Sequence, residues 1–207
     1  MNLFILAEDH DECAEYHIDK HIGKMQLEAA QIMATALWVD KILGHVPRKL
    51  NTEELGEIKA VMAVEPPIEQ RTFIRYKAAH HNHPCTIWCR ESLDNFIWTH
   101  NYVTALNSEC VWRGYKSHAS CAEVLKMPDP QKLPSQGLTP FAMAMPDELK
   151  SKNVIAAYHL FYELDKGPIA TWKRRGPPAW WNPERALTDV RYTELTPVER
   201  QKLGYLN

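Results

Sequence analysis

A row of polar side chains near the N-terminus combines the residue types that acid–base and amine chemistry need. Its members follow one another at intervals of three or four residues: His17, His21, Lys24, Glu28 and Gln31. At roughly 100° per residue, a helix brings such positions within about 80° of one another. An amine there could act as a nucleophile, a carboxylate as an acid or base, and a histidine as a proton carrier. The row is equally compatible with a solvated helix flank on which Lys24 and Glu28 pair.

A second cluster consists of three histidines that directly precede a predicted helix start at Pro84. These are His80, His81 and His83. The first turn of a helix favours anions through its N–H groups and its dipole, so His81 and His83 are candidates for phosphate binding. The alternative is a loop in which one histidine caps a backbone group and the others are exposed.

Metal binding is the other use that such histidines could have. The spacing matches no named metalloenzyme motif such as H-E-x-x-H, and we therefore expect no cofactor. The alternative is zinc or another divalent metal held by the two histidine clusters, through His17, His21, His81 and His83.

Cationic side chains flank the second cluster and recur near the C-terminus, where they alternate with Trp172, Trp180 and Trp181. Arg and Lys can hold phosphates while flat rings stack on bases. The nucleic-acid-binding residues predicted on this basis are Arg71, Arg75, Lys77, His81, His83, Arg90, Lys173, Arg174 and Arg175. The tryptophans are equally compatible with an arm that docks into the core.

The composition narrows the class of protein. The net charge of −2 argues against a dedicated non-specific nucleic-acid binder, so DNA contacts must rest on a local patch. The five cysteines form no CxxC pair, which favours a reducing compartment. No apolar run is long enough for a membrane span or a signal peptide. We expect a cytoplasmic protein without a membrane partner, and the sequence does not indicate its oligomeric state.

Hydrophobic periodicity predicts a mainly α protein, a compact single-domain helical bundle with an aromatic and basic C-terminal arm. Helices are expected over about 12–43, 52–64, 84–113, 118–125 and 147–164. Residues 2–6 are expected to form a short strand or a packed arm, and the proline-rich residues 127–146 an irregular connection. The domain is predicted to span 1–207, with a core over 1–116 and an extension over 117–207 packed on it.

Four features in this order resemble the pyrimidine-dimer DNA glycosylase-like family of phages and bacteria. They are Asn2-Leu3-Phe4; Ile22-Gly23-Lys24 followed by Glu28 and Gln31; His81 to Pro84 with Trp88; and Glu109 through Trp112-Arg113-Gly114-Tyr115. The resemblance covers about residues 2–116. It implies a small helical fold and a glycosylase whose amine attacks the sugar C1′, forms a Schiff base and can then cleave the strand.

The resemblance also implies roles for particular residues. The phage enzymes expose an N-terminal threonine amine, whereas the second residue here is Asn and the initiator methionine is expected to remain. The nucleophile is then the α-amine of Met1, or the amine of Lys24 if burial activates it. Glu28 or Asp19 is the candidate carboxylate, and His17 and His21 stand where the phage enzymes have arginines.

Three hypotheses follow. The first is a glycosylase/lyase that acts on damaged or modified pyrimidines, with Met1 or Lys24 as nucleophile and Glu28 as acid/base. The second is a metal-dependent hydrolase or nucleotide-processing enzyme that uses the His/Glu cluster. The third is a non-catalytic module that binds nucleic acid or a protein partner through Arg71, Arg75 and the tail.

Overall fold

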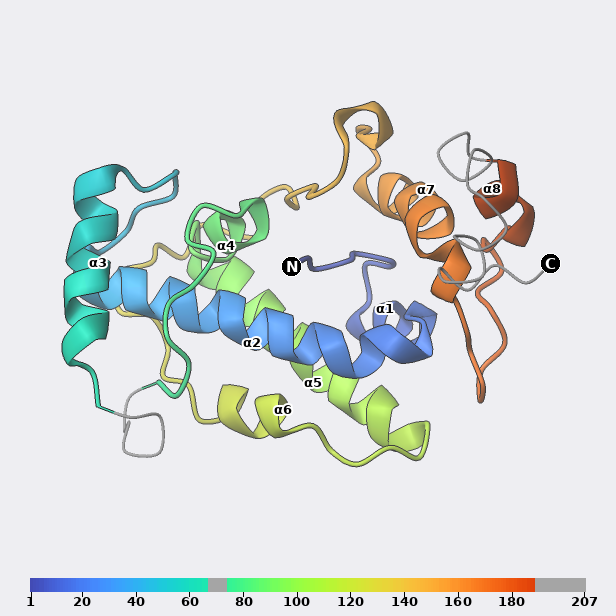
Figure 1. Ribbon diagram of the computed structural model, residues 1–207, viewed down its shortest axis with the longest axis horizontal. Helices are drawn as coiled ribbons and strands as arrows, with labels where there is room; N and C mark the ends of the chain where they lie inside the picture. Colours follow the sequence, from blue (N-terminus) through green and yellow to red (C-terminus); the bar gives the residue numbers. More distant parts are fainter. Residues whose placement is uncertain (67–73, 189–207) are drawn as a thin grey trace. The chain divides into compact units, whose positions relative to one another are not determined.

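The computed structural model describes residues 1–66 and 74–188, and all of its regular structure is helical (Figure 1). The α-helices are α1 (His10–Tyr16), α2 (Asp19–Ile42), α3 (Thr52–Val64), α4 (Pro84–Cys89), α5 (Leu93–Trp112), α6 (Ala119–Val124), α7 (Val154–Lys166) and α8 (Pro183–Thr188). Two short 3-10 turns, η2 (Asp147–Leu149) and η3 (Gly167–Ile169), flank α7. The mainly α prediction is confirmed.

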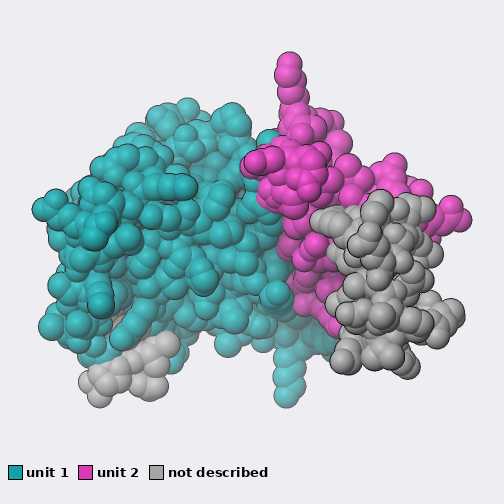
Figure 2. All heavy atoms as spheres, turned by 45° about the horizontal axis from the view of Figure 1, so that its top comes forward, with its two compact units in different colours: residues 1–3, 23–144 teal, residues 4–22, 145–207 magenta. Residues whose placement is uncertain are grey.

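Tertiary contacts divide the chain into two compact units, which Figure 2 draws in different colours. Unit 1 comprises Met1–Leu3 and Gly23–Ala144, and unit 2 comprises Phe4–Ile22 and the chain from Met145 onward. The first turn of α2 therefore belongs to unit 2 and the rest of this helix to unit 1. A single domain with an extension from residue 117 stays a prediction.

The long helix predicted over 12–43 is wrong in one respect, because it is broken at His17 and Ile18. Asp9 caps α1 by accepting a hydrogen bond from the Glu12 N–H at 2.9 Å. At His17 the backbone turns to an extended conformation. The N–H groups that follow donate to tertiary partners in unit 2: that of Ile18 to the Tyr162 hydroxyl and that of Asp19 to the Thr171 carbonyl. These long-range bonds replace the helical ones.

In unit 1, α2 supplies most of the core. Apolar residues on nearly all sides of this helix are buried: Met25, Ala29, Ala30, Ile32, Met33, Ala34, Ala36, Leu37, Trp38 and Val39. A helix that is apolar nearly all round is one that lies inside the protein. Gly44 ends it with a φ of +87°, a conformation that favours glycine, and its N–H bonds the Val39 and Asp40 carbonyls.

The helix predicted over 84–113 is also divided, into α4 and α5. Ser92 begins α5 by accepting a hydrogen bond from the Asn95 N–H at 3.1 Å. The Asn95 amide then donates to the Trp88 carbonyl near the end of α4 at 2.8 Å. A side-chain cap and a buried amide thus mark the boundary between the two helices. The continuous apolar pattern of the sequence does not reveal this boundary.

The proline-rich segment is irregular, as predicted, and side chains of unit 1 hold it in place. The Asp40 carboxylate accepts hydrogen bonds from the Gln131 and Lys132 N–H groups at 2.8 and 2.9 Å. Further along, Asn95 accepts from the Thr139 N–H, and the Phe141 ring packs on Trp88. The segment is therefore packed and hydrogen-bonded as an integral part of unit 1.

Unit 2 centres on α7, which begins at Val154 instead of at the predicted Asp147. Asn153 caps the helix by accepting from the Ala156 N–H at 3.0 Å, whereas Asp147 begins only the turn η2. The buried Glu163 carboxylate accepts from the Asn182 N–H and from Arg185, each at 2.7 Å. These two bonds attach α8 to α7.

The histidine at position 159 is expected to make unit 2 sensitive to acid. Its ring stacks on Trp180 at 3.8 Å and bonds the Leu6 carbonyl at 2.7 Å, and burial is the main cause of its lowered pKa. Below the ordinary value near 6.5 the unfolded chain binds the proton better, so stability falls as the pH drops through that range. His159→Gln keeps a donor to Leu6, and urea unfolding from pH 7 to 5 is expected to show a weaker pH dependence than for the parent chain. An unchanged dependence would contradict this assignment.

Candidate active site

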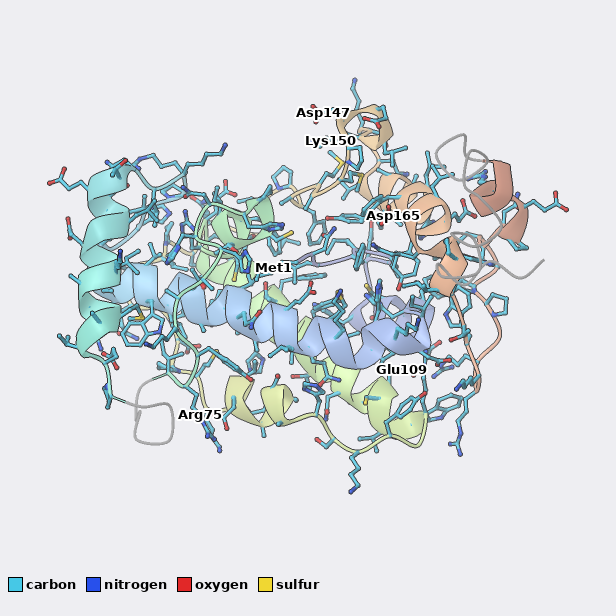
Figure 3. The ribbon with its side chains drawn as sticks, viewed as in Figure 1. Met1, Arg75, Glu109, Asp147, Lys150 and Asp165 are labelled. Carbon is cyan, nitrogen blue, oxygen red and sulfur yellow. The ribbon has the colours of Figure 1, made fainter. Side chains whose placement is uncertain are left out.

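The α-amine of Met1 lies against a carboxylate of α2. The Met1 nitrogen is 3.6 Å from Glu28 Oε2, and the Met1 side chain is only 4% exposed. Figure 3 labels Met1, beside α2 in unit 1. The backbone N–H of Asn2 donates to the same Glu28 oxygen at 2.9 Å. The chain therefore brings together an amine and a proton acceptor, the pair that amine catalysis requires.

Lys24 completes the charge pattern at this site. Its Nζ lies 3.5 Å from Glu28 Oε1, one helical turn away, so that each carboxylate oxygen faces one cation. The Lys24 side chain is 61% exposed, whereas that of Met1 is buried. The exposed Lys24 amine is therefore able to contact a phosphate.

The first turn of α4 contacts the N-terminal dipeptide from another direction. Thr86 Oγ1 lies 3.9 Å from the Met1 sulfur, and Cys85 Sγ lies 3.6 Å from Asn2 Oδ1. His83 accepts a hydrogen bond from the Cys85 N–H at 3.2 Å. Burial is the main cause of its lowered pKa, and the N-terminal amine adds to it.

His83 agrees with the alternative in which one histidine caps a backbone group, and phosphate binding by His83 stays a prediction. Its Nδ1 serves as the N-terminal cap of α4. The neighbouring His81 is half-buried, and its Nε2 has no hydrogen-bond partner among the described residues. Burial lowers the pKa of His81, followed by the charges of Arg90 and His80. Phosphate binding by His81 stays a prediction.

The two histidines of the N-terminal row belong to unit 2, where both are buried. His17 Nδ1 bonds the Cys13 carbonyl at 2.7 Å, and His21 Nδ1 bonds the Tyr162 hydroxyl at 2.8 Å. The His21 ring also stacks on Phe4 at 4.9 Å. Because His17 precedes α2, the five-residue row does not share one helix. These contacts make both rings part of an aromatic core, and their catalytic role stays a prediction.

Asp19, the other candidate carboxylate, supports a loop of unit 2. Its Oδ2 accepts from the Thr171 hydroxyl at 3.1 Å and from the Lys173 N–H at 2.9 Å. This use leaves Glu28 as the carboxylate that faces an amine.

The predicted phosphate ligands differ in how available they are. Arg71 lies outside the described residues. Lys77 is exposed, and Arg75 is half-exposed and pairs with Glu123 at 3.1 Å. In unit 2, Lys173 and Arg174 are exposed, and Arg175 pairs with Glu15 at 3.1 Å. The exposed cations keep phosphate contacts as their predicted role.

Arg90 is fully buried, and its prediction as a phosphate ligand is not supported. Its guanidinium donates to three backbone carbonyls, of Val46 at 2.8 Å and of His81 and Arg48 at 2.6 Å each. Burial lowers the pKa of Arg90 to about 10. The side chain fastens the loop after α2 and the histidine segment to the end of α4.

We expect Arg90→Met to destabilise the protein without a specific effect on DNA contacts. Three backbone carbonyls, one in a buried and two in part-buried hydrogen bonds, would lose their donor, which costs about 3 kcal/mol of unfolding free energy. Urea unfolding measures the loss, and Lys59→Met, at an exposed position of α3, is the matched control. A stable Arg90→Met protein with weakened DNA binding would restore the phosphate-contact prediction.

The tryptophans of the tail pack within unit 2. Trp172 Nε1 donates to the Tyr16 carbonyl at 3.1 Å, Trp180 stacks on His159, and Trp172 meets Trp181 edge-on. Of the two interpretations of this segment, docking into the protein is the one that these contacts favour.

Within residues 1–66 and 74–188, no group of three or more His, Cys, Asp or Glu side chains could hold a metal ion. No helix in these ranges is long and apolar enough to cross a membrane.

Sequence reasoning missed three residues of this site: Asn2, Cys85 and Thr86. The available signal was Pro84, which marks the first turn of a helix and hence a place where consecutive side chains diverge to meet a partner. The contacts of Cys85 and Thr86 with the N-terminal dipeptide join distant parts of the sequence, and no local sequence pattern predicts them.

Comparison with known proteins places the chain in a family. The family model described as pyrimidine dimer DNA glycosylase matches residues 1–123, which is more than half of the chain. The protein therefore belongs to the pyrimidine dimer DNA glycosylase family, a family of DNA repair enzymes whose substrate is DNA. The matched range includes Met1, Lys24, Glu28 and His83. No curated protein and no solved structure matches the chain.

Proposed function

We propose that the protein is a glycosylase/lyase that excises damaged or modified pyrimidines from DNA, with the Met1 α-amine as nucleophile and Glu28 as acid/base. The observation that supports this most directly is the 3.6 Å approach of the Met1 α-amine to the Glu28 carboxylate. Family membership supports the substrate class.

The first half of the proposed reaction replaces the base by the enzyme. The neutral Met1 nitrogen forms a bond to C1′, and the C1′–N bond to the pyrimidine breaks, with its electron pair leaving on the base, which takes up a proton. Glu28 accepts a proton from the attacking nitrogen. The C1′–O4′ bond then opens, O4′ is protonated, and an imine joins Met1 to the sugar.

The second half cleaves the strand and frees the enzyme. A base removes a proton from C2′, a C2′–C3′ double bond forms, and the C3′–O bond breaks as the 3′ phosphate leaves with its electron pair. Water then hydrolyses the imine and returns the amine. Glu28 is the nearest carboxylate to the amine in the described contacts and is our candidate for the proton transfers.

Exposed cations of each unit would hold the DNA backbone. Lys24 next to Glu28 and the exposed Lys77 are the candidates in unit 1, and Lys173 and Arg174 those in unit 2. The target base must leave the stack for the amine to reach C1′.

An incision assay tests the proposed function. A labelled duplex with one thymine dimer and a matched duplex with one abasic site are incubated with the protein, beside an undamaged duplex as control. We expect cleavage of the first two only. Binding of all three duplexes without turnover would instead support the non-catalytic module.

A further inference from the structure

The second residue of the chain, Asn2, is only 6% exposed, and both ends of its side-chain amide have partners in unit 1. Its Nδ2 donates to the Ala144 carbonyl at 2.9 Å, and its Oδ1 accepts from the Leu3 N–H at 2.8 Å. Cys85 Sγ lies 3.6 Å from the same Oδ1. An N-terminal segment is ordinarily poorly ordered unless it is tied down, and the Asn2 amide ties this one to the end of the proline-rich segment.

The backbone of Asn2 contacts the carboxylate that faces the amine. Its N–H donates to Glu28 Oε2 at 2.9 Å, and the Met1 nitrogen lies 3.6 Å from the same oxygen. The peptide that joins Met1 to Asn2 is planar, so once its N–H is fixed the amine moves by rotation about the Met1 Cα–C bond. The Met1 side chain is 4% exposed and its sulfur lies 3.9 Å from Thr86 Oγ1, which restrains this rotation.

We propose that Asn2 is a positioning residue, whose side-chain amide fixes the Met1–Asn2 peptide so that the Met1 amine stays beside the Glu28 carboxylate. The catalytic meaning of this inference rests on the proposed function. An amide neither takes up nor releases a proton near neutral pH, so the Asn2 side chain acts through the position of Met1. Misplacement of a reacting group by about 1 Å can cost about 100-fold in rate.

Two substitutions of Asn2 remove its side-chain hydrogen bonds in steps. Asn2→Leu keeps the branched shape but has neither the donor for Ala144 nor the acceptor for Leu3. Asn2→Asp is milder, because it keeps the shape and the acceptor and loses only the donor. Both new residues are too large for ordinary removal of the initiator methionine, and mass spectrometry establishes the N-terminus of each protein.

Thr139→Val is the matched control, because it loosens the same proline-rich segment at a position away from the dipeptide. The Thr139 hydroxyl accepts from Asn95 Nδ2 at 2.7 Å and donates to Glu91 Oε2 at 3.0 Å, and valine has the same shape without these bonds. A positioning role of Asn2 predicts that the Asn2 variants and Thr139→Val differ in chemistry. A role only in holding the segment predicts that they behave alike.

The first readout is the chemical step. Single-turnover borohydride trapping on dimer-containing duplex is expected to slow about 100-fold in Asn2→Leu, with an unchanged Kd for DNA. A smaller loss in the same direction is expected in Asn2→Asp, which decides the question if Asn2→Leu does not fold. Thr139→Val is expected to react at the parent rate even though its Tm falls. Parent rates in both Asn2 variants would overturn the inference, as would a loss that follows Tm in all three proteins.

The second readout does not depend on catalysis. Acylation of the Met1 amine in the DNA-free protein, followed on the N-terminal peptide by mass spectrometry, is expected to be several-fold faster in the Asn2 variants and unchanged in Thr139→Val. If the parent chain forms no adduct with DNA, the proposed function fails, and this rate still decides whether Asn2 holds Met1. An acylation rate that is the same in the Asn2 variants and the parent would overturn the inference.

Discussion

Glu28→Gln is expected to reduce the single-turnover rate of adduct formation on dimer-containing DNA by a factor of about 100 to 10,000. General acid–base groups contribute rate factors of this size. The amide keeps the shape of the side chain and can still accept from the Asn2 N–H, a bond of 2.9 Å in the structure. It cannot accept a proton from the Met1 amine. The loss should therefore appear in the chemical step and leave the affinity for DNA nearly unchanged.

Glu57→Gln is the matched control for this variant, because Glu57 is an exposed carboxylate on α3 of the same unit. The control should behave as the parent chain in rate, in affinity and in Tm. Glu28 would have no role in proton transfer if Glu28→Gln turned over at the parent rate. A Glu28→Gln protein with a much lower Tm would point to a structural role instead.

One added glycine before Met1 is expected to suppress adduct formation by about 100-fold or more. Consecutive Cα atoms are about 3.8 Å apart, so the new amine is displaced by roughly that distance from the position beside Glu28. The buried Met1 side chain, 4% exposed, leaves little room for the chain to slide back. The rate is measured by borohydride trapping after mass spectrometry has established the N-terminus of each protein.

Lys24→Ala is the comparison variant, because it tests the other candidate nucleophile. Lys24 is 61% exposed and is expected to act on phosphate, so its removal should weaken DNA binding while trapping at saturating protein stays within about threefold. The opposite pattern, with full trapping in the extended chain and none in Lys24→Ala, would assign the nucleophile to Lys24.

Much of the fold was predictable because helices follow from local periodicity. The start and end of α3 and the stop at Gly44 agree with the sequence-based expectation. The breaks at His17 and Arg90 were not predicted, since neither position carries a proline or glycine. The first break depends on N–H bonds from Ile18 and Asp19 to a hydroxyl and a carbonyl more than a hundred residues away, and periodicity carries no information about such partners.

The candidate site was predictable in part for the same reason. The pairing of Lys24 with Glu28 follows from helical spacing, and Met1 was named as a nucleophile from a family resemblance. Arg90 was assigned to phosphate because the sequence shows its charge but not its three carbonyl partners. The capping of α4 by His83 was open to prediction, because a histidine directly before Pro84 stands at a helix start.

The central claim is that the Met1 α-amine is the nucleophile, and mapping the trapped adduct tests it most directly. The protein is trapped with borohydride on a dimer-containing duplex, digested, and its DNA-linked peptide identified by mass spectrometry. The account predicts a single linkage, at the α-nitrogen of the peptide that begins with Met1. A linkage at Lys24 or at any other lysine would contradict it.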